Sequence, residues 1–244
     1  MTSLTYTRYE LVRVFRNRRF FIFSLGFPLA LYLIIAAPNR SVHDYSGTGI
    51  SLPLYYMVGM ASFRTMTSMI STGARIAWER QIGWTRQLRI TPLTARAYLR
   101  SKVIAAYAMA ALSLVSLYVA GTILRVSLGV GDWLKMTVLI VLGLLPFAAL
   151  GIALGHLLNV DALGPGMGGM VSLLALVSGS WFPLTHGFLH DVGQVLPSYW
   201  LVQAGRVSLH GHGWDATGWI VVLGWTAAIT LLSAFVYRRD TARV

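Results

Sequence analysis

Long apolar runs separated by short polar stretches dominate this chain of 244 residues. Six such runs occupy residues 20–37, 50–74, 103–124, 136–157, 166–183 and 216–237. A helix needs about 20 apolar residues to cross the hydrocarbon core of a bilayer. Most of the runs reach that length, although the fifth is shorter and follows a glycine-rich stretch. The pattern predicts an all-α integral membrane protein with six transmembrane helices and no separate soluble domain.

The cations are unevenly distributed between the loops. Fifteen of the 20 arginines and lysines lie in residues 1–19, in residues 75–102 and in the C-terminal tail, and few lie in the other loops. Cytoplasmic loops of membrane proteins carry such an excess of arginine and lysine. We therefore expect both termini in the cytoplasm, which agrees with an even number of spans.

Residues 1–19 precede the first apolar run and combine arginines with apolar residues. Leu4, Leu11 and Phe15 fall on one face of a helix, which predicts an amphipathic helix lying in the cytoplasmic membrane interface. A solvated basic tail is the alternative. A cleaved signal peptide is disfavoured because the following apolar run is longer than a typical signal core and five more runs come after it.

Residues 184–215 lie between the last two apolar runs and contain no uninterrupted span. Pro197, Gly193 and Gly205 divide this segment into short pieces. Broken helices at membrane depth are tolerated when protein surrounds them. We expect two short re-entrant helices entering from the outer side.

Composition excludes several classes of protein. Hydrophobic residues make up 56% of the chain and charged residues 11%, and cysteine is absent, so disulfides and thiolate metal sites are excluded. The net charge of +12 does not indicate nucleic-acid binding, because the cations lie in loops between apolar runs. His186 and His190 have a spacing that can bind a metal, but an interfacial role is preferred and we expect no metal site.

Two absences bear on the energy source. None of the eight acids lies inside an apolar run, whereas ion-coupled carriers and intramembrane acid–base enzymes need a carboxylate there. A phosphate-binding G-x-x-x-x-G-K-[ST] loop is impossible, because the two lysines, Lys102 and Lys135, do not follow a glycine. If ATP drives this protein, we expect another chain to bind ATP and Mg²⁺, and this chain to bind no cofactor.

Arg64 lies near the middle of the second apolar run, among serine, threonine and methionine residues. A charge at that depth is costly and should face protein or water. One interpretation makes this face the wall of a permeation path. The alternative is a helix-packing face on which Arg64 bonds to backbone carbonyls. Gly151 and Gly155 form a GxxxG pair, for which helix packing is the preferred role.

Residues 78–102 read WERQIGWTRQLRITPLTARAYLRSK. This segment resembles the cytoplasmic coupling segment of type-2 ABC exporter permeases. The matching residues, with Thr85 displaced by one position, are Glu79, Arg80, Gly83, Thr85, Leu88, Thr91, Pro92 and Leu93. Thr91 is suited to cap a helix that has Pro92 in its first turn, so we expect a helix, a sharp break and a second helix leading into the third span.

Residues 178–206 carry a second match, to the end of the fifth span and the re-entrant helices of the same family. In that segment the outer re-entrant candidates are Pro183, Pro197, Trp200 and Arg206. The resemblance implies a permease that pairs with a second permease chain and two ATPase subunits in a bacterial cell membrane, with contact to membrane lipid. It also implies a substrate path lined by the second and fifth spans, with Met60, Arg64, Thr67, Ser68, Ser71, Ser172, Val177 and Trp181 as candidates.

The expected function is the permease subunit of an ATP-driven exporter for a drug, an antibiotic or another amphipathic molecule. Export of a lipid, glycolipid or polysaccharide is the alternative substrate class. A membrane enzyme acting on lipid and a non-transporting scaffold are alternatives of a different kind. The enzyme lacks a convergent nucleophile or acid–base pair, and the scaffold leaves Arg64 unexplained.

Overall fold

A computed structural model describes residues 3–16, 18–210 and 213–241 of the chain. Within these ranges every regular element is a helix, which confirms the all-α prediction for the described residues. The first half contains α1 (Ser3–Arg16), α2 (Arg18–Ala36), α3 (Leu52–Ile70), α4 (Thr72–Gln81), α5 (Trp84–Arg89) and α6 (Ala95–Ile123). The second half contains α7 (Val130–Gly143), α8 (Leu145–Leu157), α9 (Val160–Ser178), α10 (Phe188–Gln194), α11 (Pro197–Gln203), the 3₁₀ turn Ala204–Arg206, α12 (Val207–His210) and α13 (Ala216–Thr241).

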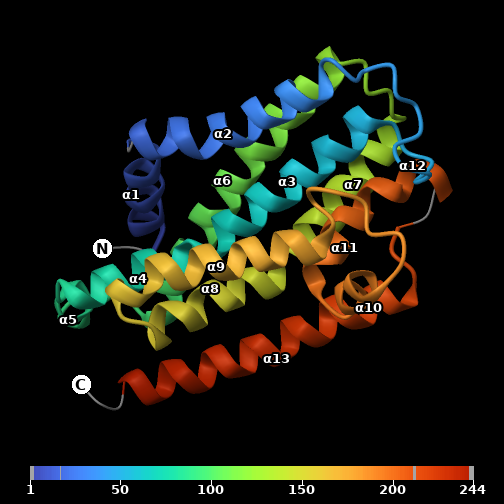
Figure 1. The fold of residues 1–244 in the computed structure, drawn as a ribbon. Coiled ribbons are helices and arrows are strands. Elements are labelled where there is room, and N and C mark those ends of the chain that lie inside the picture. The colour runs from blue at the N-terminus through green and yellow to red at the C-terminus, as the bar shows by residue number, and fades with distance from the viewer. Residues whose placement is uncertain (1–2, 17, 211–212, 242–244) are drawn as a thin grey trace.

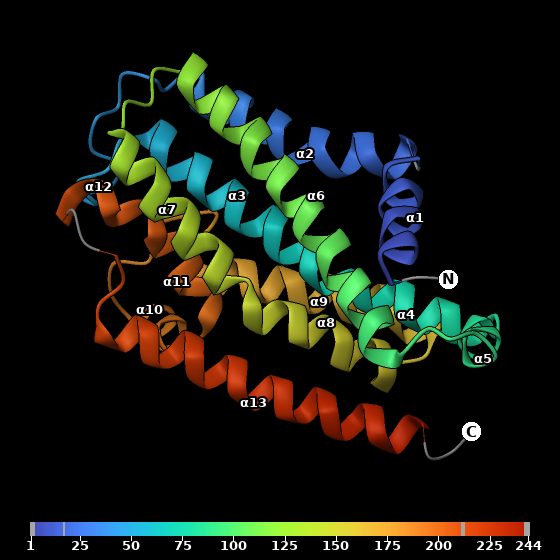
Figure 2. The ribbon, with the colours of Figure 1, turned by 180° about the vertical axis from the view of Figure 1, so that it is seen from behind.

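The long helices form a bundle with two distinct ends (Figures 1 and 2). The first and last described residues lie at the same end as α4 and α5, while α10, α11 and α12 lie towards the opposite end. Helix α1 runs crosswise to α2 at the first of these ends. An even number of crossings would place the first and last described residues at one end, and that number stays a prediction.

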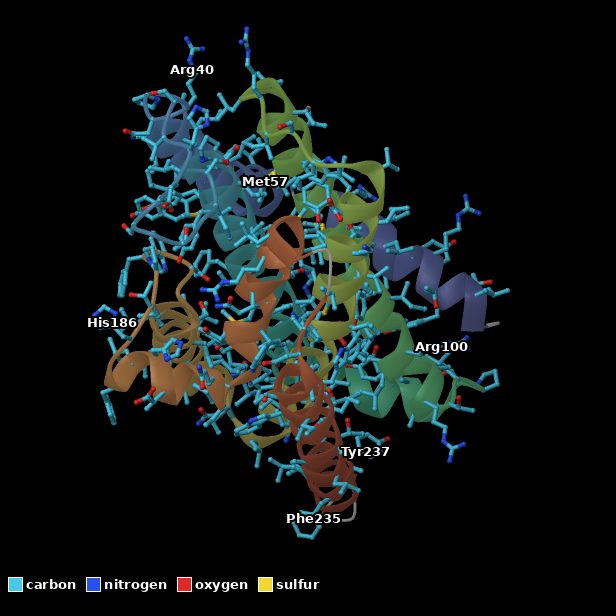
Figure 3. The ribbon with its side chains drawn as sticks, turned by 90° about the vertical axis from the view of Figure 1, so that its right-hand side faces the viewer. Arg40, Met57, Arg100, His186, Phe235 and Tyr237 are labelled. Carbon is cyan, nitrogen blue, oxygen red and sulfur yellow. The ribbon has the colours of Figure 1, made fainter. Side chains whose placement is uncertain are left out.

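Helix α3 is the centre of the bundle. It packs against α2, α6, α8, α9 and α11, and all of its residues except Phe63 and Thr67 are buried. Met57 points into the bundle from α3, whereas Arg40 and Arg100 project away from it (Figure 3). The second apolar run therefore forms a core helix surrounded by protein.

Four helices of the described chain are long and apolar enough to cross a membrane. They are Ala95–Ile123, the pair α7–α8 taken together as Val130–Leu157, Val160–Ser178 and Ala216–Tyr237. Helix α3 is not among them because Arg64 and several hydroxyl residues lower its hydropathy, and only Leu25–Ala36 of α2 counts as a shorter apolar helix. Several membrane-spanning helices are thus present, and six spans stay a prediction.

Several boundaries differ from those expected. The run 50–74 is divided at Ser71 into α3 and α4, and the fourth run is divided at Leu144, where Pro146 of α8 cannot donate a backbone hydrogen bond. The fifth run does not remain helical to residue 183. Helix α9 ends at Ser178 because Gly179 adopts a left-handed conformation with φ 76°, a common helix ending.

Candidate functional site

A buried cluster of charged side chains joins three helices at the end of the bundle that carries α5. Nζ of Lys102, on α6, donates hydrogen bonds to Oε1 of Glu79 on α4 (2.6 Å) and to Oε1 of Glu10 on α1 (2.8 Å). Lys102 is 1% exposed and Glu79 is fully buried. The hydroxyl of Tyr98 donates to the second oxygen of Glu79 (2.6 Å). We call Glu10, Glu79, Tyr98 and Lys102 the ionic junction.

Arg13 extends the ionic junction towards the surface of α1. One of its terminal nitrogens donates to Oε1 of Glu79 (2.6 Å), and its guanidinium lies 5.8 Å from the ring centre of Trp78. Burial lowers the pKa of Arg13, but the hydrogen bond to Glu79 and the negative charges of Glu79 and Glu10 together outweigh burial and raise the pKa. Nearby on α1, burial raises the pKa of Tyr6 to about 12. Arg13 is therefore charged and Tyr6 neutral at ordinary pH.

Arg80, the neighbour of Glu79 on α4, contacts a different helix. A terminal nitrogen of Arg80 donates to the carbonyl oxygens of Gly155 (2.9 Å) and His156 (3.1 Å) in the last turn of α8. The last four carbonyls of a helix lack partners within the helix, and a cation there also interacts favourably with the helix dipole. Glu79 and Arg80 thus join α4 to opposite neighbours, α6 and α8.

Close packing of glycines supports the contact between α8 and α3–α4. A Cβ atom added to Gly73 would collide with the backbone carbonyl of Gly151, and one added to Gly155 would lie 2.8 Å from Cβ of Ile76. The absence of side chains lets the two backbones approach. Helix packing was the role predicted for Gly151 and Gly155, and these contacts confirm it.

The turn between α4 and α5 exposes apolar side chains. Gly83 adopts φ 74°, a conformation that suits glycine, and begins α5. Ile82, Trp84 and Ile90 are exposed, with Ile90 at 89%. We call residues 82–90 the α5 corner; the side chain of Thr85 lies outside the described residues, and Leu88 is half-buried.

The cap predicted at Thr91 is wrong. Helix α6 begins at Ala95, and the side chain of Thr94 accepts a hydrogen bond from the backbone of Ala97 (3.3 Å). Thr91 donates instead to the carbonyl of Leu88 (2.7 Å), and Pro92 is exposed in the turn before the helix. Thr94 was overlooked because Thr91 and Thr94 are both suited to cap a helix, and Pro92 directly after Thr91 favoured the first of them.

The candidate path residues fall into two groups. Met60, Arg64 and Ser68 are buried inside the single chain, and Ser68 bonds to the carbonyl of Ala106 on α6. The more accessible candidates are Thr67, Ser71, Ser172, Val177 and Trp181. The ring of Phe63, which the sequence did not single out, packs edge-on against Trp181 at 5.5 Å. The two groups therefore differ in burial: the first is enclosed by the chain and the second reaches its surface.

Tyrosines connect the other end of α3 to the residues after α9. The hydroxyl of Tyr55 donates to the carbonyl of Gly179, and that of Tyr56 donates to the carbonyl of Trp181 (3.1 Å). Tyr45 joins them through a 3.1 Å hydroxyl contact with Tyr56. Sequence patterns missed these tyrosines because their partners are backbone atoms more than 120 residues away.

The outer candidates are distributed around this end of the bundle. Pro197 and Trp200 are buried on α11, and the ring nitrogen of Trp200 donates to the carbonyl of Gln194 (2.9 Å). Pro183 and Arg206 are half-buried and line one small cavity with Tyr55. Among the described residues no group of three or more potential metal ligands gathers.

Several apolar helices of bilayer length, packed around the buried helix α3, define a multi-pass membrane protein. The family model described as "ABC-2 family transporter protein" matches residues 36–236, and the chain belongs to that family. It is also 29% identical over 238 residues to "Putative transport permease YvfS" of Bacillus subtilis (strain 168), with 96% of each chain covered. The resemblance to type-2 ABC permeases is confirmed, and the family implies association with an ABC ATPase and another permease chain.

Proposed function

We propose that this chain is the permease subunit of an ATP-driven exporter in a bacterial cell membrane, with both termini in the cytoplasm. Two copies of an ATPase subunit bind ATP and Mg²⁺, and a second permease chain completes the transporter. The exported cargo is a drug, an antibiotic or another amphipathic molecule. Family membership supports the transport role, and the ionic junction beside the α5 corner supports the coupling mechanism.

The α5 corner offers the ATPase an exposed apolar surface. Ile82, Trp84 and Ile90 are all exposed, Ile90 most of all, and exposed apolar clusters often mark interaction sites. The corner follows α4, whose last turn carries Glu79 and Arg80. Movement of a bound ATPase therefore reaches α1 and α6 through Glu79, and α8 through Arg80. The ionic junction is the observation that carries this mechanism.

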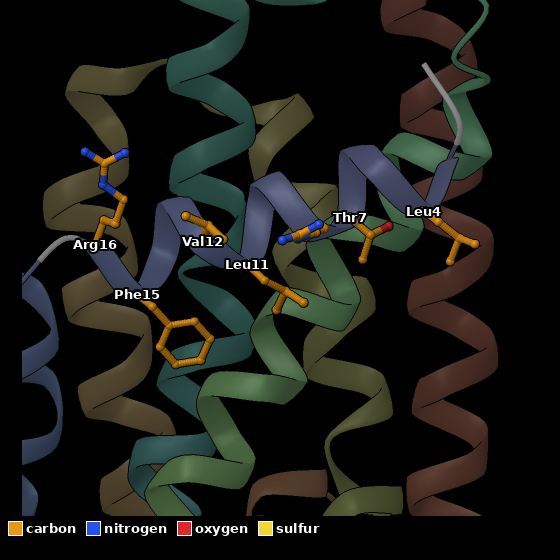
Figure 4. Close-up of a pocket in the computed structure, with 7 residues that line it drawn as sticks. Leu4, Thr7, Leu11, Val12, Phe15 and Arg16 are labelled. Atoms are coloured by element: carbon orange, nitrogen blue, oxygen red, sulfur yellow. The ribbon is translucent and has the colours of Figure 1, made fainter.

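Helix α1 anchors the same end of the protein to membrane lipid. A shallow groove follows this helix and is lined by Leu4, Thr7, Arg8, Leu11, Val12, Phe15 and Arg16 (Figure 4). Leu4 and Phe15 are exposed, whereas Leu11 packs against the cluster around Val14 and Met109. Apolar side chains together with arginines suit the interface of a membrane that contains anionic lipid.

Copurification and ATPase assays test the proposal. The variant Ile90→Asp places a charge in the α5 corner and should abolish copurification of the ATPase subunit and cargo-stimulated ATP hydrolysis. Phe188→Asp is the matched control, because Phe188 is also highly exposed (79%) but lies at the opposite end of the bundle. Equal ATPase binding by the Ile90→Asp variant and the unmodified chain would refute docking at the α5 corner. A chain that transports cargo without an ATPase would refute the exporter function itself.

A further inference from the structure

Arg64 is a buried cation with unused hydrogen-bond donors. It lies midway along α3 and is 4% exposed. Its Nε and Nη2 atoms are buried, and no acceptor among the described residues bonds to either of them. The alternative in which backbone carbonyls satisfy these two nitrogens is therefore not what the structure shows.

Two other cations of the chain show what satisfies such a group. Lys102 is bonded to two carboxylates, and Arg80 is bonded to two carbonyls in the last turn of α8. Arg64 lies where neither solution is available. Its two buried nitrogens reach no carbonyl oxygen of the described residues, and none of the eight acids of the sequence lies in an apolar run.

Deprotonation does not remove this buried charge, because a guanidinium stays protonated in proteins. A buried charge without a partner is strongly destabilising. A second copy of this chain would bring the same acid-free apolar runs, so it would add no carboxylate at this depth. A bound anionic molecule would supply the missing negative charge.

The surroundings of Arg64 indicate the kind of molecule. Met57, Met60 and Ser68 lie on the same helical face of α3. The bond from Ser68 to Ala106 directs this face towards α6. Methionine side chains adapt to apolar groups of varied shape, and an arginine fork matches a carboxylate or phosphate. The face thus places one cation beside buried, adaptable apolar side chains.

We propose that Arg64 binds the carboxylate or phosphate of an amphipathic anion inside the helix bundle. The inference rests on the proposed transport function and assigns the acidic class to its cargo. A phospholipid headgroup offers the same chemistry as an acidic cargo, so the experiment contains an arm for each source. Arg64 is then a specificity-determining residue that discriminates charged from neutral molecules of equal length.

The test uses the complete transporter, with its ATPase, in phosphatidylcholine nanodiscs. Dodecanoate and its methyl ester are the probes, because they share one alkyl chain and differ in charge. The concentration for half-maximal stimulation of ATP hydrolysis is measured for the unmodified chain, Arg64→Met, Arg64→Lys and Arg40→Met. Arg40 is exposed on a loop, so Arg40→Met removes the same charge from the surface.

Arg64→Met should raise the dodecanoate concentration for half-maximal stimulation roughly ten- to a hundredfold. That factor corresponds to the usual contribution of hydrogen bonds to a charged group. The response to the methyl ester should not change. Arg64→Lys should keep part of the preference for dodecanoate, because it keeps the charge and loses the fork. Arg40→Met should behave as the unmodified chain. If Arg64→Met fails to assemble, the Arg64→Lys preference decides the result.

An equal response of the unmodified chain and Arg64→Met to dodecanoate, without a lipid effect, overturns the inference. In the lipid arm, phosphatidylglycerol is added to the nanodiscs. Stimulation that requires both this lipid and Arg64 supports the anion site and assigns it to a headgroup. If the methyl ester still stimulates ATP hydrolysis while anions show no dependence on Arg64, the inference fails and the proposed function stands. Absence of any ATPase-dependent transport would instead refute the proposed function.

Discussion

Nζ of Lys102 lies 2.6 Å from Oε1 of Glu79, and both side chains are buried. The same lysine lies 2.8 Å from Glu10, so one cation serves two carboxylates from different helices. Desolvating charges is expensive, and this arrangement is stable only while every member keeps its partners. The pair therefore fixes the position of α1 and α4 relative to α6 at the base of the third predicted span.

Replacing Glu79 by glutamine should disrupt the ionic junction. Lys102 and Arg13 would each lose an ionic partner, and removing one partner of a buried pair costs about 3–5 kcal/mol. We expect a lower unfolding temperature in detergent and loss of transport. Asp132→Asn is the control, because Asp132 and Lys135 form a partly exposed pair 3.9 Å apart, and such pairs contribute little. Equal stability of the two variants would contradict the role assigned to Glu79.

Replacing Arg80 by methionine should separate α4 from the end of α8. Two charge-assisted hydrogen bonds to carbonyls would be lost, each worth about 1.5–3 kcal/mol at most. ATP hydrolysis by the bound ATPase should continue, but cargo should no longer stimulate it. The comparison of basal and stimulated rates in nanodiscs measures this effect. Full cargo stimulation in the variant would show that α8 receives no movement through Arg80.

Replacing Gly73 by alanine should push α4 away from α8. The added methyl group would meet the backbone carbonyl of Gly151, which has no flexible side chain to move aside. Overpacking of this kind typically costs about 1–3 kcal/mol. Gly224→Ala is the matched control, because nothing lies within 4 Å of its added Cβ and alanine favours the helix. The thermal unfolding temperature should therefore fall for Gly73→Ala and stay level or rise for Gly224→Ala.

Replacing Tyr56 by phenylalanine should loosen the contact between α3 and the residues after α9. The change removes the bonds to Trp181 and Tyr45, which contribute about 1 kcal/mol each. A double-mutant cycle with Tyr45→Phe measures how much of that effect the two tyrosines share. Strictly additive effects on the unfolding free energy would contradict the coupling seen in the structure.

The sequence predicted the membrane class of the protein and, by resemblance, the transporter family to which it belongs. Apolar runs and arginine placement are local signals, because bilayer thickness and loop charge act on each segment separately. The segment around Glu79 and Arg80 was singled out by its resemblance to a family motif, and its coupling role stays a prediction. Thr94 as the cap of α6 was missed, since Thr91 and Thr94 offer the same local chemistry and only the helix start distinguishes them.

Only the tertiary structure brought Glu10 to Lys102, because the two residues are 92 positions apart and no periodic pattern connects them. The same holds for Arg80 and the end of α8. Arg64 shows most clearly what the sequence and the tertiary structure each determined. Its cost inside a membrane was evident from its position in the sequence, but whether any group satisfied it depended on which helices surrounded α3. Local physics determined where the helices run, and long-range packing decided which buried charges found partners.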